Sequence, residues 1–194
     1  MQPMNIALFQ WLGAGHAPNP QLLWFATLAA EGASWLCLAL LAWVAWRKPA
    51  QRSYAMATLV AAAVAAIAAH ALADALNFPR PFATGLSPSY IEHGARGSLP
   101  SAHASVMFTL ALVLGLRPAL RNVGLAVFAI ALVTAWARIY VGVHFPLDIA
   151  AGFALAALIT ASFWVVSIAV HRFIVPLIAR DDARSARTAR SLGA

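Results

Sequence analysis

The chain has 194 residues, of which 62% are hydrophobic and only 10% are charged. Soluble domains contain about 45 to 50% apolar residues, so the composition excludes an ordinary soluble domain and indicates a polytopic membrane protein. The formal net charge of +7 would fit a nucleic-acid-binding protein, but the positions of the charges fit membrane topology instead, and we expect no nucleic-acid partner.

The first apolar segment, residues 4–12, is too short to span a bilayer and is followed by several glycine and proline residues, so we expect a short helix lying on the membrane surface. Five longer runs come next, each long enough, or nearly so, to cross about 30 Å of hydrocarbon. They cover residues 21–46, 54–77, 102–116, 123–137 and 146–170. The predicted fold class is therefore all-α, a polytopic bundle of about five transmembrane helices with one short interfacial helix.

The lysine and arginine residues are divided unevenly between the two sides of the membrane that alternating spans define. Ten of the 13 fall on one side, and three fall on the other: Arg80, Arg96 and Arg138. Because cytoplasmic loops carry the excess of positive charge, we expect the N-terminus outside and the C-terminus in the cytoplasm. Residues 1–180 are predicted to form one integral-membrane domain, and residues 181–194 a basic, disordered cytoplasmic tail.

Three polar segments lie together on the outer side: DALNFPRPF (74–82), SLPSAH (98–103) and ARIYVGVHFPLD (137–148). The arginine fork matches phosphate oxygens two at a time and keeps its charge at any working pH, which makes Arg80 and Arg138 candidate phosphate ligands. In the second segment Ser101 is placed to cap a helix. Ser101 and the first free backbone N–H groups, beginning at Ala102, would then complete an anion cradle.

Each of the last two segments also holds a histidine. Asp148 follows His144 by four residues, and a carboxylate near an imidazole fixes the tautomer and leaves the other ring nitrogen free as a nucleophile or base. His103 lies near the start of a 15-residue apolar run, at a depth that a lipid phosphate can reach. Two histidines, an aspartate and two arginines on one membrane face favour catalysis over a structural role.

These segments resemble the three signature motifs of the type 2 phosphatidic acid phosphatase superfamily, which read K-x6-RP, PSGH and SR-x5-H-x3-D. Here RP is residues 80–81, PSAH covers residues 100–103, and AR-x5-H-x3-D covers residues 137–148. Within the superfamily, the chain most resembles the short bacterial undecaprenyl-diphosphate phosphatases. The resemblance implies a lipid phosphate or diphosphate substrate among membrane lipids, and an active site on the outer, periplasmic face of the bacterial cytoplasmic membrane.

The resemblance also implies a role for each residue. His144 would attack phosphorus and form a phosphohistidine, with Asp148 orienting its ring. His103 would protonate the leaving oxygen and later help to activate water. The phosphoryl oxygens would be held by Arg80, Ser101 and Arg138. No metal and no other cofactor is expected, because arginines and a helix N-terminus supply the positive field.

Two positions depart from the family pattern. Ala73 occupies the place of the first-motif lysine, and Ala137 occupies the place of the serine before Arg138. The lysine contact is therefore absent or is supplied by another residue, such as Arg96. We interpret both changes as variation within the family, because every residue assigned a bond-breaking role is present.

Other polar residues lie close to these segments. Glu31 lies in the middle of the first span, where the sequence favours structural and functional roles equally. His70 and Asp74 share one face of the second span, and a structural hydrogen bond is favoured there, with Asp74 also a candidate accessory residue. His93 falls in the polar outer loop and is expected to be solvated.

Three alternatives to undecaprenyl diphosphate hydrolysis stay open on the sequence. A related enzyme would hydrolyse phosphatidylglycerol phosphate, diacylglycerol pyrophosphate or lipid A phosphate, or would transfer the phosphate to another lipid. A metalloenzyme would use His103, His144 and Asp148 as a facial ligand set, although a cation site would not normally recruit two arginines. A non-catalytic transporter or scaffold would use the anion site only for binding. The sequence also leaves the oligomeric state open.

Overall fold

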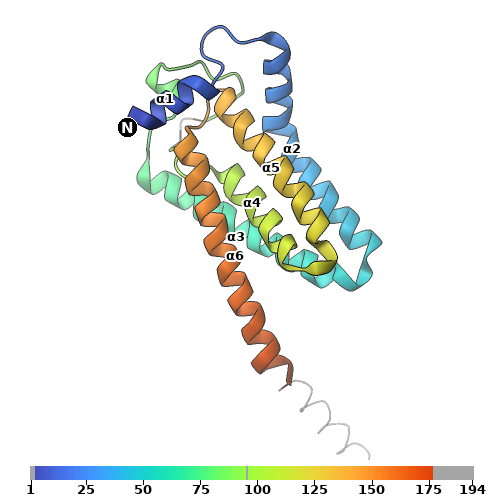
Figure 1. Cartoon of the computed structure of the whole chain (residues 1–194). Helices are drawn as coiled ribbons and strands as arrows, with labels where there is room; N and C mark the ends of the chain where they lie inside the picture. Colours follow the sequence, from blue (N-terminus) through green and yellow to red (C-terminus); the bar gives the residue numbers. More distant parts are fainter. Residues whose placement is uncertain (1–2, 95, 177–194) are drawn as a thin grey trace, which may run out of the picture. The chain divides into compact units, whose positions relative to one another are not determined.

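The computed structural model describes residues 3–94 and 96–176, so the predicted tail at residues 181–194 lies outside the described part of the chain. The described residues contain helices and no strands (Figure 1). The α-helices among them are α1 (Pro3–Leu12), α2 (Pro20–Arg47), α3 (Arg52–Leu76), α4 (Ala102–Leu116), α5 (Arg121–Tyr140) and α6 (Pro146–Ala169). The predicted all-α fold class is therefore confirmed.

Proline residues and capping side chains set several helix boundaries. The Asn19 side chain accepts hydrogen bonds from the first backbone N–H groups of α2, with Pro20 in the first helical position. At the C-terminal end of α3, Asn77 adopts the left-handed conformation that commonly terminates a helix. Short 3₁₀ turns that begin with proline lie at Pro49–Gln51 (η1), Pro81–Thr84 (η2) and Pro118–Leu120 (η3), and α6 passes into a π-helical turn at Val170–Ile174 (η4).

The helices are long and apolar enough to form the predicted spans. Four segments of the described chain qualify by length and hydropathy: Pro20–Arg47, Pro49–Thr84, Pro118–Tyr140 and Pro146–Ile174. The fifth, α4, is equally apolar but has 15 residues, about 22 Å of helix. α5 runs three residues beyond the predicted end at Ala137, because Arg138 is buried in its last turn rather than lying after it. The segment at residues 4–12 is helical as predicted, and its position at the membrane surface stays a prediction.

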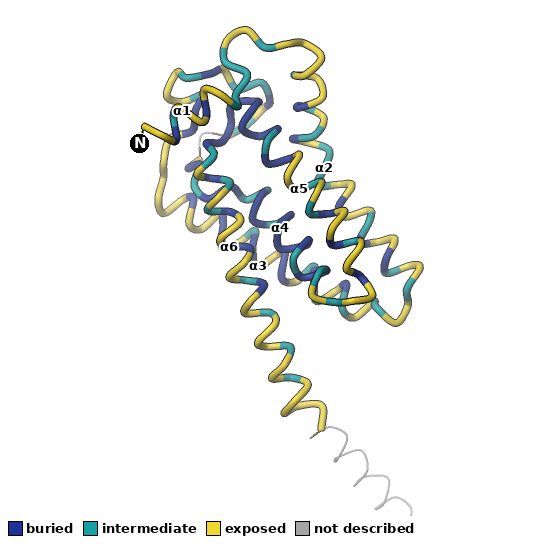
Figure 2. The backbone as a smooth tube through the Cα atoms, viewed as in Figure 1, coloured by how far each residue is buried: buried dark blue, intermediate teal, exposed yellow. Residues whose placement is uncertain are grey.

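The chain divides into two compact units, residues 1–160 and residues 161–194. In the first unit α4 packs against both α3 and α5, and α2 also packs against α5 (Figure 1). Figure 2 shows that α4 is buried along most of its length. In the second unit the described residues continue α6 and end just after η4. Every predicted site residue lies in the first unit, and a single domain over residues 1–180 stays a prediction.

The interior face of α3 is made of small residues, while many large apolar residues of the helices face outward. The buried positions of α3 are alanines, apart from Thr58. By contrast, Trp24, Trp35 and Ile67 each expose more than two thirds of their surface. Lipid tails are as apolar as leucine, so helices in a membrane gain most from close backbone approach, which small residues allow. The distribution therefore fits a bundle surrounded by lipid, and it lets α3 and α5 approach the polar end of α4 closely.

Gly124 tests this close packing, because a Cβ there would lie 2.7 Å from Gly115 N and 2.9 Å from Ala111 O of α4. We expect Gly124→Ala to lower the apparent melting temperature in detergent, at a cost of about 1–3 kcal/mol for an overpacked contact. Gly115→Ala is the matched control, since nothing lies within 4 Å of its added Cβ. Equal melting temperatures for the two variants would contradict the close α4–α5 contact.

Candidate active site

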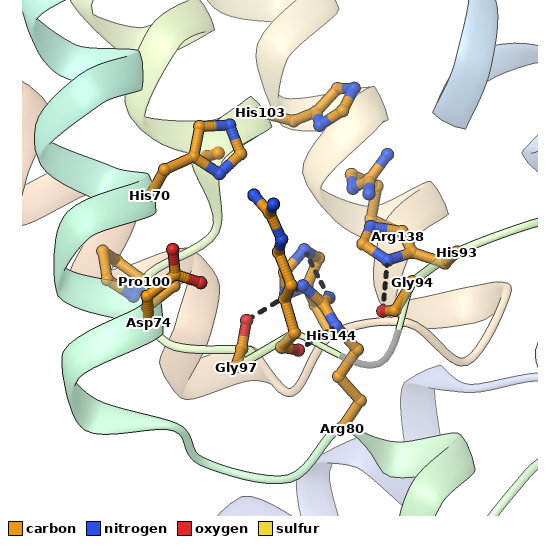
Figure 3. Close-up of a pocket in the computed structure, with 13 residues that line it drawn as sticks. His70, Asp74, Arg80, His93, Gly94, Gly97, Pro100, His103, Arg138 and His144 are labelled. Carbon is orange, nitrogen blue, oxygen red and sulfur yellow. Dashed lines mark hydrogen bonds between the residues drawn. The ribbon is translucent and has the colours of Figure 1, made fainter.

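The polar segments recognised in the sequence converge on one cavity of about 320 Å³, which we call the main cavity. Its walls come from α3, the loop between α3 and α4, the start of α4, the end of α5 and the loop before α6 (Figure 3). Of the predicted site residues, those lining it are Asp74, Arg80, Arg96, Ala102, His103, Arg138 and His144. Helix ends and loops from separate parts of the sequence thus bring His103, His144 and three arginines to one space.

His144 is buried, and both of its ring nitrogens have partners. Nδ1 lies 3.3 Å from Asp148 Oδ2, and Nε2 lies 3.3 Å from Arg80 Nη1. An ionised carboxylate only accepts hydrogen bonds and a guanidinium only donates them, so Nδ1 carries the proton and Nε2 carries the lone pair. The Asp148 oxygen also accepts a 2.8 Å hydrogen bond from Phe145 N, which fixes the carboxylate. The predicted pairing of His144 with Asp148 is therefore present in the structure, and it leaves Nε2 as the unprotonated ring nitrogen.

The backbone around His144 is held from several sides. The N–H groups of Val143 and His144 both donate to Arg138 O at the end of α5. Gly142, with a φ of +82°, adopts a left-handed conformation and allows Pro88 of the α3–α4 loop to approach closely. On another side, Phe9 of α1 packs against Phe145 with ring centroids 5.3 Å apart. These contacts fix the position of the imidazole although His144 lies in a loop.

Arg80 connects the two loops that form the site. Its Nε donates to Arg96 O at 2.9 Å and its Nη2 donates to Gly97 O at 3.0 Å. Its Nη1 donates to Val143 O at 2.9 Å and also faces His144 Nε2. Backbone carbonyls thus hold most of the five N–H donors of this buried guanidinium, and one N–H of Nη2 is left for an anion.

Arg138 has more free donors than Arg80. It is 2% exposed, and its Nη1 donates to Ala30 O of α2 at 3.2 Å. Its buried Nε makes no hydrogen bond to any described residue. A buried donor without a partner is costly, and a bound anion would satisfy it. Arg138 is therefore the clearest candidate for an anion-binding donor in the cavity wall.

The start of α4 agrees only in part with the predicted cradle. Ser101 caps the helix as predicted, since its hydroxyl accepts from Ala104 N at 3.5 Å. However, Ser101 is fully buried, its own N–H donates to Asp148 O, and it does not line the main cavity. The Ser101 hydroxyl is turned toward the helix, and its contact with a phosphate stays a prediction. Ala102 and His103 do line the cavity.

Ala73 and Arg96 are brought together by Gly97. The backbone of Gly97 lies so close to the Ala73 carbonyl that no Cβ would fit there. Arg96 therefore starts beside the position that lacks the family lysine, and both residues line the main cavity. Among the described residues, no hydrogen bond joins Asp74 to His70, so the favoured structural bond between them is not observed. Both side chains are exposed to the main cavity instead.

A second cavity of about 360 Å³, which we call the side cavity, adjoins the main cavity. His93, Gly94, His103 and Arg138 line both, while Glu31 lines only the side cavity. His93, which the sequence predicts to be solvated, is half-buried, because its loop turns inward and sets its ring 6.0 Å from that of His144. No spacing in the sequence indicates this approach, because the loop has no periodic pattern.

Among the described residues, no group of three or more His, Cys, Asp or Glu side chains is arranged to hold a metal ion. The alternative facial set of His103, His144 and Asp148 therefore has no geometric support. The Asp148 carboxylate is engaged by His144 Nδ1 and a backbone N–H rather than directed at the cavity.

The protonated forms of His93 and His144, the two loop histidines that line the main cavity, are disfavoured. Burial lowers the pKa of His144 well below its ordinary value, and the charges of Arg138 and Arg80 lower it further. Burial also lowers the pKa of His93 to about 4, against the smaller opposing effect of a hydrogen bond to Gly94. Both rings are therefore neutral near pH 7 in the free protein.

Acid should destabilise the protein through His93. Its folded pKa of about 4 lies below the ordinary 6.5, so between these values the unfolded chain binds a proton that the folded chain does not. The contribution that neutral His93 makes to the free energy of unfolding above pH 6.5 is lost as the pH falls toward 4. We expect the apparent melting temperature to fall less between about pH 7 and about pH 5 in His93→Gln than in the wild type. His16→Gln, which changes an exposed histidine outside the cavities, should keep the wild-type fall; equal slopes in all three proteins would contradict the prediction.

Comparison with known proteins agrees with this geometry. A family model described as the PAP2 superfamily matches residues 54–172. YbjG of Escherichia coli (strain K12), provisionally named an undecaprenyl-diphosphatase, is 30% identical over 154 residues, which cover 78% of this chain and 77% of that protein. The undecaprenyl-diphosphatase BcrC of Bacillus subtilis (strain 168) is 29% identical over 96 residues, which cover 50% of this chain and 49% of BcrC.

Two solved structures share the fold. The crystal structure of LpxE from Aquifex aeolicus superposes with a TM-score of 0.69 at 23% identity, covering 84% of this chain and 96% of that one. The crystal structure of a transmembrane PAP2 type phosphatidylglycerolphosphate phosphatase from Bacillus subtilis gives a TM-score of 0.66 at 20% identity, covering 88% and 87%. Since the family model spans more than half of the sequence, the chain belongs to the PAP2 superfamily of membrane lipid phosphatases.

Proposed function

We propose that the protein hydrolyses undecaprenyl diphosphate to undecaprenyl phosphate and inorganic phosphate through a phosphohistidine at His144. The observation that carries this proposal is the state of the His144 ring, which lines the main cavity with its Nε2 lone pair beside Arg80 Nη1 while Asp148 accepts from Nδ1. The buried, unpartnered Nε of Arg138 supports an anionic substrate. The preference for the diphosphate rests on the similarity to proteins named undecaprenyl-diphosphatase.

The first step of the proposed reaction forms the phosphohistidine. The Nε2 lone pair of His144 bonds to the terminal phosphorus as the bond from that phosphorus to the bridging oxygen breaks. His103 gives its proton to the departing bridging oxygen, and undecaprenyl phosphate leaves. Arg80 and Arg138 stabilise the charge on the terminal phosphoryl oxygens. The negative substrate itself favours the protonated form of His103 before this step.

The second step releases phosphate. A water molecule attacks the phosphorus from the side that the lipid has left, and its proton passes to His103. The bond between phosphorus and His144 Nε2 breaks, which returns the lone pair to the ring and frees inorganic phosphate. Both histidines then have their starting protonation, so the cycle needs no external acid, base or oxidant. The proton stays on His144 Nδ1 throughout, and Asp148 accepts a hydrogen bond from it and holds the ring in one orientation.

We further propose that the site opens on the outer face of the bacterial cytoplasmic membrane. The site lies at the end of α3, the start of α4 and the end of α5. The opposite helix ends carry Arg47, Arg52, Arg117 and Arg121, which is the distribution expected of a cytoplasmic side. The terminus after α6 would then be cytoplasmic.

Trapping the intermediate tests the proposed function. Undecaprenyl diphosphate carrying ³²P in the terminal phosphate is mixed with the purified protein in detergent containing EDTA and then quenched. We expect label on the protein that is stable to base and lost in acid, as for a phosphohistidine. His144→Ala should remove the label and lower turnover about a thousandfold or more.

His16→Ala is the matched control, because it removes an exposed histidine outside the main cavity and should keep wild-type labelling and turnover. Turnover of phosphatidylglycerol phosphate, but not of undecaprenyl diphosphate, would overturn the substrate assignment. Wild-type labelling in His144→Ala would overturn the assigned nucleophile, and activity abolished by EDTA would favour a metalloenzyme.

We also propose that Arg96 supplies the phosphate contact that the lysine provides elsewhere in the family. Its support is the proximity of Arg96 to Ala73 on the wall of the main cavity. Arg96→Ala should lower kcat/KM about tenfold or more, as expected when one donor to a phosphoryl group is lost.

The same proposal predicts rescue by a lysine at position 73. The double variant Ala73→Lys with Arg96→Ala should recover most of the lost activity, because the new ammonium enters the same cavity. Ala73→Met with Arg96→Ala is the control, since methionine adds similar bulk without charge. Recovery with methionine, or full activity of Arg96→Ala alone, would contradict the role of Arg96.

A further inference from the structure

His93 occupies a position that the mechanism above does not use. It belongs to the loop between α3 and α4, and its ring stands edge-on to that of His144 at an interplanar angle of 82°. Figure 3 shows His93 beside Arg138 on one side of the main cavity, with His70 and Asp74 on the other side. His93 is therefore close to the nucleophile without contacting Asp148 or the lone pair.

The loop that carries His93 is fixed just before it reaches the cavity. Tyr90 N donates to Val141 O at 3.1 Å, and Tyr90 Oη donates to Gly15 O at 2.8 Å. Ile91 is buried in a cluster with residues of α2 and α5. These bonds tie the loop to both the α1–α2 connection and the end of α5. The ring is thus presented by a braced segment, as a binding residue requires.

The contact with Gly94 orients the ring of His93. Nδ1 lies 3.1 Å from Gly94 O, and since a carbonyl only accepts, Nδ1 carries the proton in the neutral ring. Nε2 makes no hydrogen bond to another residue in the described part of the chain. Burial keeps the ring neutral without a ligand, with a pKa of about 4, and a nearby anion would favour protonation of Nε2.

The order of the residues along the cavities indicates what His93 would meet. The terminal phosphorus must lie against His144, and the bridging oxygen must face His103, which lines both cavities. Whatever follows the bridging oxygen therefore points from the main cavity toward the side cavity. His93 lines this shared wall, while Glu31 and Glu92, which line only the side cavity, would repel an anion there.

We infer that His93 binds the inner phosphate of a diphosphate lipid through Nε2, as a second anion contact that a monophosphate lipid would leave unused. The inference rests on the proposed function, because it assumes that the terminal phosphate lies at His144. It assigns His93 a part in choosing diphosphates over monophosphates. In a monoester, carbon follows the leaving oxygen, so no anionic oxygen would reach the His93 ring.

Competitive inhibition by two anions tests this inference in the purified full chain. Methylenediphosphonate presents two phosphoryl groups, and inorganic phosphate presents one. We expect His93→Ala to raise the Ki of methylenediphosphonate about 10- to 100-fold, the size of one charge-assisted hydrogen bond, and to change the Ki of phosphate less than about twofold. His70→Ala, across the same cavity, should leave the ratio of the two constants at its wild-type value.

Two conservative variants separate binding from loop structure. Glutamine places an amide nitrogen near the position of Nε2, so His93→Gln should keep part of the preference for methylenediphosphonate. Asparagine reaches only the position of Nδ1 and the Gly94 contact, so His93→Asn should lose the preference. The reverse order, an equal rise in both Ki values, or no inhibition of the active wild type by methylenediphosphonate would overturn the inference.

Failure of the proposed function would look different. It would appear as a wild-type protein that releases no phosphate from farnesyl diphosphate, a short prenyl diphosphate, or from undecaprenyl diphosphate. Binding of the same two anions by calorimetry would still test His93 in that case. A wild-type preference for methylenediphosphonate that His93→Ala removes would support the second contact, and an unchanged preference would overturn it.

Discussion

The Nε2 lone pair of His144 depends on two partners whose hydrogen-bonding roles cannot be exchanged. The Asp148 carboxylate accepts at one nitrogen and the Arg80 guanidinium donates at the other, so the reactive tautomer is set by the identity of its neighbours. Burial and the nearby arginines keep the ring neutral. Much of the first unit holds this arrangement in place: α6 supplies Asp148, the α3–α4 loop supplies Arg80 and the carbonyls that hold it, and α1 supports Phe145.

The two buried arginines of the site have hydrogen-bond partners for part of their donors. Backbone carbonyls from two loops surround Arg80, whereas Arg138 keeps a buried donor open. Burying a cation is costly unless hydrogen bonds replace its water. The bonds of Arg80 to carbonyls meet this cost and join the loops, whereas Arg138 has a donor left for the proposed anionic ligand. The alanine-rich face of α3 lets the walls of the main cavity approach one another closely.

The sequence predicts those features that depend on neighbours close along the chain. Hydropathy locates the spans, and the four-residue spacing of His144 and Asp148 places both groups at the start of one helix. The sequence does not predict contacts between residues that are far apart along the chain. The inward turn of His93 and the meeting of Ala73 with Arg96 depend on the path of an aperiodic loop. The Ser101 hydroxyl was predicted to cap a helix and does so, but whether it also reaches the cavity depends on a burial that no local pattern encodes.

The carbonyl partners of Arg80 affect how its substitution must be interpreted. Replacing Arg80 by lysine would keep the charge but could not span the carbonyls of Arg96, Gly97 and Val143 in one plane. The α3–α4 and α5–α6 loops would then lose one of the contacts that join them, next to the contact between Tyr90 N and Val141 O. Under the proposed function, a kinetic defect at position 80 therefore combines the loss of a phosphate ligand with a loosened pair of loops, and its size overstates the contact between arginine and phosphate. The Arg138 side chain donates one hydrogen bond to a backbone carbonyl, so substitution of Arg138 gives the cleaner measure of that contact.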